Sequence, residues 1–368
     1  MKCKPKVQLS GKSRRLTYLF HKWNEGDIFA SVRANQPRKG EMKTVSVGVV
    51  GVGHLGSRHL KHLLDLPAVD CAGFYDIDPE RSHQIEELFG AKAHTSLAAL
   101  IDVCDALSIV VPTTDHFAVA KECMESGKSV FIEKPMCKTL AEANKLIKLG
   151  EEKNAVIQVG HVERLNPAIL AIEELALKPK YIETHRLAPY NVRGTEVPVV
   201  LDLMIHDLDV ILSLVDSPVE SIGASGVSIM TSSVDIANAR LRFENGCVAN
   251  ITSSRIAKDF VRKLRLFQQD MYVTIDFFLG LTEVYRVLEA GVRDPNAVFT
   301  APLKGKNRER QIVYEKPQVE KIDALKLELE NFVVSLAREQ SPIVSGEEAR
   351  EALRIALEIQ EKIEQDIH

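Results

Sequence analysis

Metal-binding and redox motifs are absent from this sequence. Its six cysteines never stand in the Cys-x-x-Cys spacing of zinc sites and redox centres. Several lie inside apolar runs, which favours buried thiols in a reducing compartment. The cysteines are Cys3, Cys71, Cys104, Cys123, Cys137 and Cys247. We therefore predict no metal site and a cytoplasmic location.

Long apolar runs and several catalytic motifs are missing as well. No apolar run reaches the ~18 residues that a membrane-spanning helix needs, and none follows the basic N-terminus as in a signal peptide. The sequence has no Gly-x-Ser-x-Gly nucleophile turn, no Walker-type lysine loop and no His-Glu-x-x-His. These absences disfavour membrane insertion and several hydrolase classes. Hydride transfer is the candidate chemistry that remains.

Charge is distributed unevenly along the chain. Residues 1–43 carry eleven Lys or Arg against three Asp or Glu, a net charge of +8, whereas the whole chain has a net charge of −4. The remainder is acidic, which argues against nucleic acid as the main partner. We expect residues 1–41 to be a disordered basic extension, from an over-extended gene start before Met42. A mobile arm that touches a membrane surface or a partner is the alternative.

A glycine-rich turn organises the chain that follows. The 368 residues suit two domains, and the first opens with an apolar run that leads into Gly51-x-Gly53-x-x-Gly56 and a helical segment. Gly51 suits a tight turn, Gly53 lets the backbone approach a pyrophosphate, and Gly56 lets helix pack on strand. The free N–H groups of the helix would face the anion. The spacing predicts a dinucleotide site; a turn that binds nothing is the alternative.

The acid after the second apolar run indicates which dinucleotide is bound. The run Val69 to Tyr75 ends at Asp76, about the expected distance past the glycines for a carboxylate that accepts a hydrogen bond from a ribose hydroxyl. Because a carboxylate repels a 2′-phosphate, Asp76 favours NAD over NADP. A surface acid without a ligand is the alternative.

Strand-like and helical segments alternate from Val45 to Gly160, which predicts an α/β fold with a parallel, doubly wound sheet. Further strands are expected at 106–111, 130–132 and 156–159, with helices at 117–125 and 140–153. Ligands of such sheets lie beyond the carboxyl ends of the strands. The residues expected to bind the cofactor are Gly51, Gly53, His54, Leu55, Gly56, Asp76, Pro112, Thr113, His116 and Glu133.

The pattern changes after about residue 165, where an α+β domain with an open, mostly antiparallel sheet and helices on one face is expected. Strands are expected at 236–243, 247–254, 264–267 and 272–277, with a hairpin signal at Glu244-Asn245-Gly246. Helices are expected at 168–177, 200–215, 321–338 and 346–365. Residues 292–318 are charged and loop-like.

Lys134 ends an apolar strand before Pro135, so it is expected to project near the nicotinamide as a general acid or base. Burial or a neighbouring cation makes a lysine release its proton more readily. Glu133 is expected to orient Lys134, to bind the cofactor ribose or only to solvate the strand end. An exposed lysine beside a turn is the alternative for Lys134.

Asp202 and His206 stand four residues apart in an apolar segment, which puts them on one helix face. Burying polar side chains among apolar ones is costly unless they have hydrogen-bonding partners or line a cleft. His206 is a candidate base on a substrate hydroxyl, with Asp202 setting its tautomer or binding a neighbouring hydroxyl. A buried structural pair is the alternative. Asp207 and Asp209 are expected to be solvated or to cap the helix.

The glycine turn, Glu133-Lys134-Pro135 and Asp202-x-x-x-His206, in this order, resemble the Gfo/Idh/MocA oxidoreductases from Met42 to the C-terminus. The resemblance implies an NAD-binding Rossmann domain at 42–164. It also implies a C-terminal substrate and oligomerisation domain at 165–368, whose open sheet forms a homodimer or homotetramer interface. The family uses the lysine of Glu-Lys-Pro together with the histidine.

Three further segments, 160–167, 200–207 and 262–265, resemble the subgroup of UDP-N-acetylglucosamine 3-dehydrogenases. This implies oxidation of the sugar's 3-hydroxyl by NAD on a route to lipid A, with a downstream sugar aminotransferase as partner. Lys134 and His206 would be the acid/base pair, with either one as the base and Asp202 as orienter.

Two arginines and two rival functions complete the expectations. Arg164 and Arg193 are candidates for contact with substrate hydroxyls or the pyrophosphate, because a guanidinium suits bidentate phosphate binding. A structural salt bridge is the alternative for each. The rival enzyme is a dehydrogenase of an inositol-like free polyol or of another nucleotide sugar, and the rival of another class is a non-catalytic NAD-binding sensor or scaffold.

Overall fold

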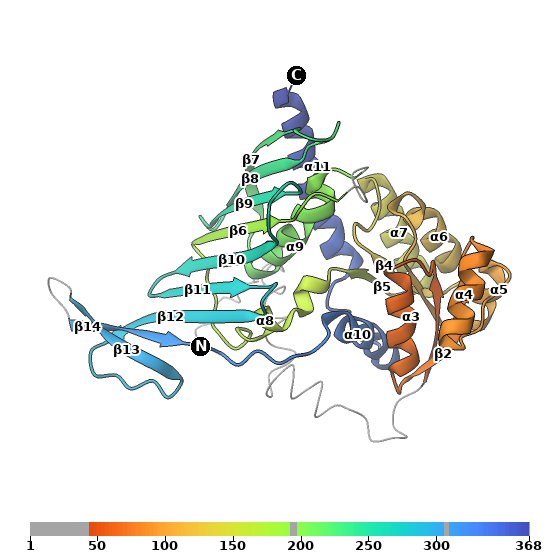
Figure 1. Cartoon of the computed structure of the whole chain (residues 1–368), viewed down its shortest axis with the longest axis horizontal. Coiled ribbons are helices and arrows are strands. Elements are labelled where there is room, and N and C mark those ends of the chain that lie inside the picture. Colours follow the sequence, from red (N-terminus) through yellow and green to blue (C-terminus); the bar gives the residue numbers. More distant parts are fainter. Residues whose placement is uncertain (1–43, 192–196, 305–308, 368) are drawn as a thin grey trace, which may run out of the picture. The chain divides into compact units, whose positions relative to one another are not determined.

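The computed structural model describes residues 44–191, 197–304 and 309–367. The expected basic extension of residues 1–41 and the candidate Arg193 lie outside these ranges. The described chain forms a five-stranded sheet followed by a nine-stranded sheet, each packed against helices (Figure 1). This arrangement confirms the predicted α/β fold class.

The first sheet has the strand order β2-β1-β3-β4-β5, and all its neighbouring strands are parallel. Its strands are β1 (Val45–Val50), β2 (Val69–Tyr75), β3 (Ala106–Ile109), β4 (Ser129–Glu133) and β5 (Ile157–Gly160). Its helices are α3 (Gly56–Asp65), α4 (Pro79–Phe89), α5 (Leu97–Val103), α6 (Thr113–Glu125) and α7 (Leu140–Lys153). Because β3, β4 and β5 are apolar and covered on both faces, they read as continuous hydrophobic runs.

Local sequence signals fix where these helices begin and end. Asp78 caps α4 by accepting from two main-chain N–H groups, and Gly90 ends it in the left-handed conformation. Thr139 and Glu142 form a capping box at the start of α7. The helices therefore begin at defined positions just after the strand ends.

The second sheet has the order β13-β14-β12-β11-β10-β6-β9-β8-β7, and only the β6–β9 pair is parallel. Its strands are β6 (Tyr181–Leu187), β7 (Val219–Val227), β8 (Ile236–Phe243), β9 (Val248–Ser254), β10 (Val261–Gln268), β11 (Met271–Asp276), β12 (Leu281–Glu289), β13 (Ala297–Lys304) and β14 (Glu309–Glu315). One face packs on α9 (Ile205–Leu214) and on the C-terminal half of α11 (Gly346–Ile367). The open, mostly antiparallel sheet with helices on one face is therefore confirmed.

Several elements differ from the sequence prediction. Residues 292–318, expected to be loop, contain the hairpin β13–β14, whose exposed side chains and Pro302 are typical of an edge strand. Strands β6, β7 and β12 were not anticipated. The helix expected at 168–177 is only the single turn α8 (Pro167–Leu170). The helix expected at 200–215 begins as a π-helix (Val200–Met204) before α9.

The last two helices both pack on the first sheet, and the second of them also packs on the second sheet. Helix α10 (Ala324–Arg338) places Leu329 and Phe332 in the core that β1 and α3 line, although residues 165–368 were expected to form a separate domain. Helix α11 packs Leu353 against the first sheet's core and Ile359 against the second. The exact domain boundary at residue 164 stays a prediction, but α11 packs on the cores of both sheets and so links them.

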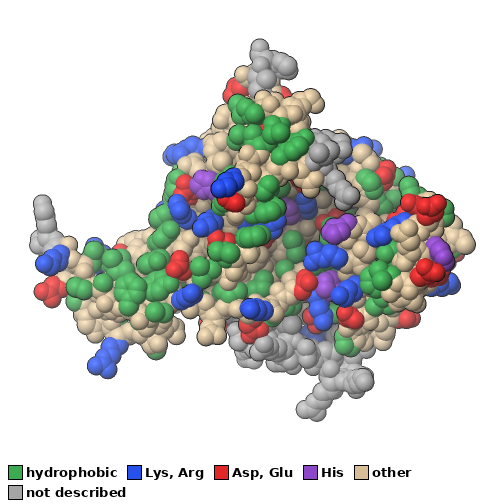
Figure 2. Space-filling model, viewed as in Figure 1, with side chains coloured by type: hydrophobic (Ala, Val, Ile, Leu, Met, Phe, Trp, Pro, Cys, Tyr) green, Lys and Arg blue, Asp and Glu red, His purple; other side chains and the backbone are tan. Residues whose placement is uncertain are grey.

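The other face of the nine-stranded sheet carries an aromatic ladder. Its rings stack on adjacent strands with centroid separations of 4.6 to 5.8 Å, and Figure 2 shows hydrophobic side chains gathered over β12–β14. The ladder consists of Tyr181, Phe267, Tyr272, Tyr285 and Tyr314. Aromatic surface of this kind is enriched at protein interfaces.

Candidate active site

The glycine turn between β1 and α3 leaves room for a ligand. A Cβ atom at Gly56 would lie 1.9 Å from the main-chain oxygen of Gly51, so this position must be glycine for helix and strand to pack. A Cβ at Gly53 would meet no atom within 4 Å. The protein interior therefore does not require glycine at position 53, whereas a backbone that approaches a pyrophosphate does.

The N-terminus of α3 suits an anion. Neither His54 nor Leu55 gives its main-chain N–H to a partner within the described chain, no side chain caps the helix, and its first turn has no acid. Asp76, after β2, accepts a hydrogen bond from the N–H of Val52 at 2.7 Å, which fixes its carboxylate beside the turn. These residues fit NAD: the N–H groups would hold the pyrophosphate and Asp76 a ribose hydroxyl.

The strand ends beyond β3 contribute differently from what the sequence predicts. Pro112 and Thr113 begin α6 at the carboxyl edge of the sheet, as a cofactor contact requires. His116 is buried, and its two ring nitrogens each lie 2.9 Å from a main-chain oxygen, that of Pro135 or that of Val111. Burial lowers the pKa of this histidine. His116 thus fixes two strand-end loops relative to each other and offers no free ring nitrogen to a cofactor.

Glu133, at the end of β4, is held in place by His59 of α3. Its Oε1 lies 3.2 Å from Nε2 of the buried His59, and its Oε2 accepts from the N–H of Lys134. Burial acts to raise the pKa of Glu133, but His59 and Lys134 outweigh it and the pKa is lowered. An ionised Glu133 therefore fixes the start of the Glu-Lys-Pro segment. No sequence pattern singles out His59, whose side chain meets Glu133 only in the folded chain.

Lys134, just after β4 of the first sheet, contacts Asp202, which lies in the π-helical turn before α9. The Nζ of Lys134 donates to the main-chain oxygen of Asp202 at 2.7 Å and lies 3.2 Å from its Oδ1. The lysine side chain is 19% exposed and that of Asp202 is 39% exposed, so the pair borders solvent. The π-helical turn at Val200–Met204 carries Asp202 toward Lys134.

His206 lies one turn further along, at the start of α9, and is half-buried. Its Nδ1 is buried and has no hydrogen-bond partner in the described chain. Burial lowers the pKa of His206 well below its usual value, and the positive charges of Lys134 and Arg186 add to this. The imidazole is therefore neutral near pH 7 and able to accept a proton. The contact expected between Asp202 and His206 is replaced by the one between Asp202 and Lys134.

Arg164 is committed to a buried ion pair. Its guanidinium donates to both carboxylate oxygens of Asp209, at 2.7 and 3.1 Å, and both residues are buried. This bidentate pair is the structural alternative considered for Arg164, and it leaves little of the guanidinium for a substrate. It also corrects the expectation that Asp209 is solvated or caps the helix.

Asp207 is likewise buried and paired. It accepts two hydrogen bonds from Arg186 of β6, at 2.9 and 3.1 Å, and Arg186 also donates to Glu163 at 2.9 Å. Although burial disfavours the charge, Asp207 and Glu163 raise the pKa of Arg186. These pairs hold α9 and therefore His206 against the second sheet.

Two buried polar residues near this network were not anticipated. His161 follows β5 and is 1% exposed, with neither ring nitrogen hydrogen-bonded in the described chain. Glu328 of α10 is also buried with both carboxylate oxygens unpartnered there, and burial together with Glu133 raises its pKa well above 4.5. Such groups are stable only if His161 is neutral and Glu328 protonated, or if ordered water reaches them.

Comparison with known proteins places this geometry in a family. Residues 45–161 match the model of the oxidoreductase family with an NAD-binding Rossmann fold, and residues 186–269 match the GFO/IDH/MocA C-terminal domain. The chain belongs to the Gfo/Idh/MocA family of oxidoreductases. It is therefore assigned to NAD-dependent dehydrogenases that act on a CH–OH group, with NAD bound by the Rossmann domain.

Gfo/Idh/MocA relatives differ in substrate. The UDP-N-acetylglucosamine 3-dehydrogenase of Acidithiobacillus ferrooxidans is 34% identical over 318 residues, 86% of this chain and 96% of that protein. Its solved structure superposes with a TM-score of 0.79, at 33% identity, over 89% of this chain and all of that chain. The myo-inositol 2-dehydrogenase of Thermotoga maritima is 23% identical over 87% of this chain and 96% of that protein.

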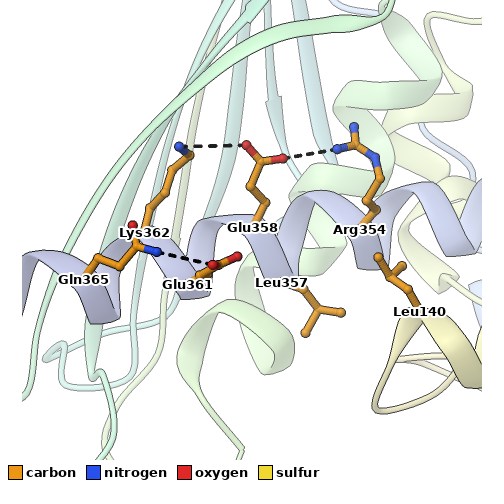
Figure 3. A pocket seen from close by; sticks show the side chains of 7 residues that line it. All are labelled: Leu140, Arg354, Leu357, Glu358, Glu361, Lys362 and Gln365. Atoms are coloured by element: carbon orange, nitrogen blue, oxygen red, sulfur yellow. Dashed lines mark hydrogen bonds and ion pairs between the residues drawn. The ribbon is translucent and has the colours of Figure 1, made fainter.

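A separate hollow of about 430 Å³ lies between the start of α7 and the solvent face of α11 (Figure 3). Leu140 and α11 side chains from Arg354 to Gln365 line it. Its charges are already paired with one another, since Glu358 contacts both Arg354 and Lys362. None of the candidate catalytic or cofactor residues lines this hollow.

Two properties of residues 44–191, 197–304 and 309–367 bear on other functions. No group of three or more His, Cys, Asp or Glu side chains there is arranged to hold a metal ion. None of the helices in these ranges is both long enough and apolar enough to span a bilayer.

Proposed function

We propose that this chain oxidises the 3-hydroxyl of UDP-N-acetylglucosamine with NAD. The observation that carries the proposal is the meeting of Lys134 with Asp202 beside a neutral His206, at the carboxyl edge of the NAD-binding sheet. A relative that covers 86% of this chain at 34% identity and is named for this substrate supports the choice of sugar.

The mechanism divides the work between the two basic side chains. NAD, when bound, supplies the hydride acceptor for the sugar's C3. The neutral His206 accepts the hydroxyl proton, while Lys134, held by Asp202, hydrogen-bonds the same oxygen and stabilises the negative charge that develops on it. One C–H bond and one O–H bond break, and the products are a 3-ketosugar, NADH and protonated His206. Lys134 then releases a proton to solvent and accepts the proton held by His206, so that both side chains return to their starting states.

A substrate panel tests the proposal. NADH formation is followed by absorbance with UDP-N-acetylglucosamine, free N-acetylglucosamine and myo-inositol, each with and without glutamate and a sugar aminotransferase. The aminotransferase removes the ketosugar, because oxidation of an alcohol by NAD is uphill near neutral pH. We expect NADH only with the nucleotide sugar. Activity confined to myo-inositol would refute the substrate assignment and favour the polyol reading, which the Thermotoga maritima relative supports.

A non-catalytic NAD-binding sensor remains the alternative of another class. It would bind NAD yet reduce none of it with any nucleotide sugar or polyol, even when product is removed. The presence of both Lys134, which contacts Asp202, and a His206 whose pKa is lowered favours the enzyme.

The assembly and partners belong to the same proposal. The aromatic ladder, in which Phe267 is exposed and Tyr272 and Tyr285 are half-buried, supports a homodimer or homotetramer that pairs the open faces of two sheets. A sugar aminotransferase on the lipid A route would use the product. The cytoplasmic location inferred from the cysteines stays a prediction.

A further inference from the structure

Arg262, at the start of β10, lies one layer away from the catalytic histidine. It stands directly opposite Arg186 in the β6–β10 pairing, on the sheet face that packs against α9. Arg186 binds Asp207, the residue after His206. The charge of Arg262 contributes to the lowered pKa of His206. Arg262 is therefore placed to meet a substrate that reaches His206.

The guanidinium of Arg262 lacks an adequate acceptor. Its one ion pair within the described chain is a 3.9 Å approach to Oε1 of Glu163. Arg186 and Asn166 already donate to the two oxygens of Glu163, each at 2.9 Å. The Arg262 side chain is 42% exposed, so a ligand in solution can reach it. Burial and the neighbouring Arg186 lower its pKa, although a guanidinium stays charged at neutral pH.

Two exposed aromatic residues lie close to Arg262 along the backbone. Phe260 and Phe278 stack with centroids 5.7 Å apart and an angle of 16° between their planes. Phe260 lies two residues before Arg262, and Phe278 follows Phe277, whose N–H donates to the main-chain oxygen of Arg262 at 2.9 Å. The rings are 49% and 55% exposed, so a large part of the stack is uncovered.

The turn that carries Phe278 is fixed in place. Oδ1 of Asp276 accepts from the N–H groups of Phe278 and Leu279, and its Oδ2 lies 3.4 Å from the Nζ of Lys263. A stacked pair of rings on such a turn loses little freedom when a planar group binds it. Figure 2 shows Lys, Arg and His side chains around the hollow beside this sheet, which agrees with a site for an anionic ligand.

We propose that Arg262 and the Phe260–Phe278 stack form the nucleoside-diphosphate subsite of the substrate. Arg262 binds the diphosphate, because its fork of free N–H donors matches phosphate oxygens, and the aromatic stack receives the pyrimidine base. The inference rests on the proposed oxidation of a nucleotide sugar and assigns substrate selection to residues outside the Lys134–His206 pair.

The test measures binding of UDP and of uridine to the full-length chain with NADH present, by calorimetry. Wild-type protein binds UDP more tightly than uridine. R262Q weakens the affinity for UDP by about 10- to 100-fold and leaves the affinity for uridine unchanged, because only the charge-assisted contacts to the diphosphate are lost. The matched control is R265Q, on the same strand but on the opposite face and paired with Glu183, which leaves both affinities unchanged.

The aromatic half of the proposal has its own variants. F278A weakens the affinities for UDP and for uridine alike by about tenfold, because stacking on the base is lost. F278Y, which keeps an aromatic ring, restores both affinities. NADH affinity and melting temperature of every variant are measured in parallel, so that a folding defect is recognised.

The outcomes separate the two claims. If wild-type protein oxidises UDP-N-acetylglucosamine and binds UDP, but R262Q binds UDP as tightly as wild type, the subsite is elsewhere and the proposed function stands. If wild-type protein binds no UDP and oxidises only myo-inositol, the proposed function fails and the subsite fails with it.

Discussion

Lys134 Nζ lies 2.7 Å from the main-chain oxygen of Asp202 and 3.2 Å from its carboxylate, although 68 residues separate the two along the chain. The contact joins the end of β4 in the first sheet to a π-helical turn before α9. The position of Lys134, the proposed acid/base residue, relative to the cofactor-binding turn therefore depends on how the two sheets are held. Helix α11, which packs on the cores of both sheets, supplies that support.

Removal of either basic side chain is expected to stop the chemistry without preventing cofactor binding. K134A and H206A should each lower kcat by about 10²- to 10⁴-fold, the usual contribution of a positioned acid/base group. NAD affinity, measured by fluorescence titration, should change little. K138A is the matched control, because Lys138 is an exposed lysine four residues further along. An active K134A/H206A double variant would contradict the assigned roles.

Two glycines of the cofactor turn should respond in opposite ways to alanine. G53A should fold with an unchanged melting temperature, since its Cβ meets nothing within 4 Å, but should bind NAD at least tenfold more weakly. G56A should lose stability, because its Cβ would lie 1.9 Å from the main-chain oxygen of Gly51. Differential scanning fluorimetry with and without NAD distinguishes them. Unchanged NAD affinity in G53A would mean that the pyrophosphate does not approach this turn.

Glu328 should make the protein less stable as pH rises. Its folded-state pKa is raised well above 4.5, so the folded state keeps a proton that the unfolded state loses above that value. Its stabilising contribution is present below pH 4.5 and falls by about 1.4 kcal/mol per pH unit until the folded pKa is reached. E328Q, which cannot ionise, should therefore equal wild type near pH 4.5 and exceed it at pH 7. Urea denaturation at several pH values measures the difference, and a difference independent of pH would contradict this prediction.

Arg164 should prove structural. R164Q removes the partner of the buried Asp209, and breaking a buried ion pair costs about 3 to 5 kcal/mol of unfolding free energy. R265Q breaks an exposed pair with Glu183 and should cost no more than about 1 kcal/mol. Denaturant unfolding compares the two. A stable R164Q protein with a raised KM would instead return Arg164 to the role of a substrate contact.

Local patterns in the chain explain what the sequence could predict. The glycine turn, the strand ends and the placement of Lys134 follow from short segments whose period and spacing are set by the backbone. The parallel sheet follows from the alternation of such segments, and the structure agrees. His206 was predicted as a site residue because burying a polar side chain in an apolar helix costs free energy, so such a residue is expected to have a functional or structural role.

Partners distant in sequence explain what could not be predicted. From the sequence, Asp209 is expected to be a solvated helix residue. Its partner Arg164 stands 45 residues earlier and comes into contact with it only in the folded chain. Arg186 likewise finds Asp207 only through the pairing of β6 with its neighbours. The β13–β14 hairpin was missed because an edge strand exposes both of its faces, which hides the alternation that indicates a strand.

The most direct test of the central claim follows a labelled hydrogen. UDP-N-acetylglucosamine with deuterium at C3 is incubated with the protein, NAD and the glutamate-dependent aminotransferase, and the cofactor is analysed by mass spectrometry both in solution and bound to the protein. The account predicts that deuterium appears on the reduced nicotinamide with wild-type protein and K138A, and not with K134A or H206A. Reduced cofactor without deuterium, or deuterium transfer that survives in both variants, would contradict it.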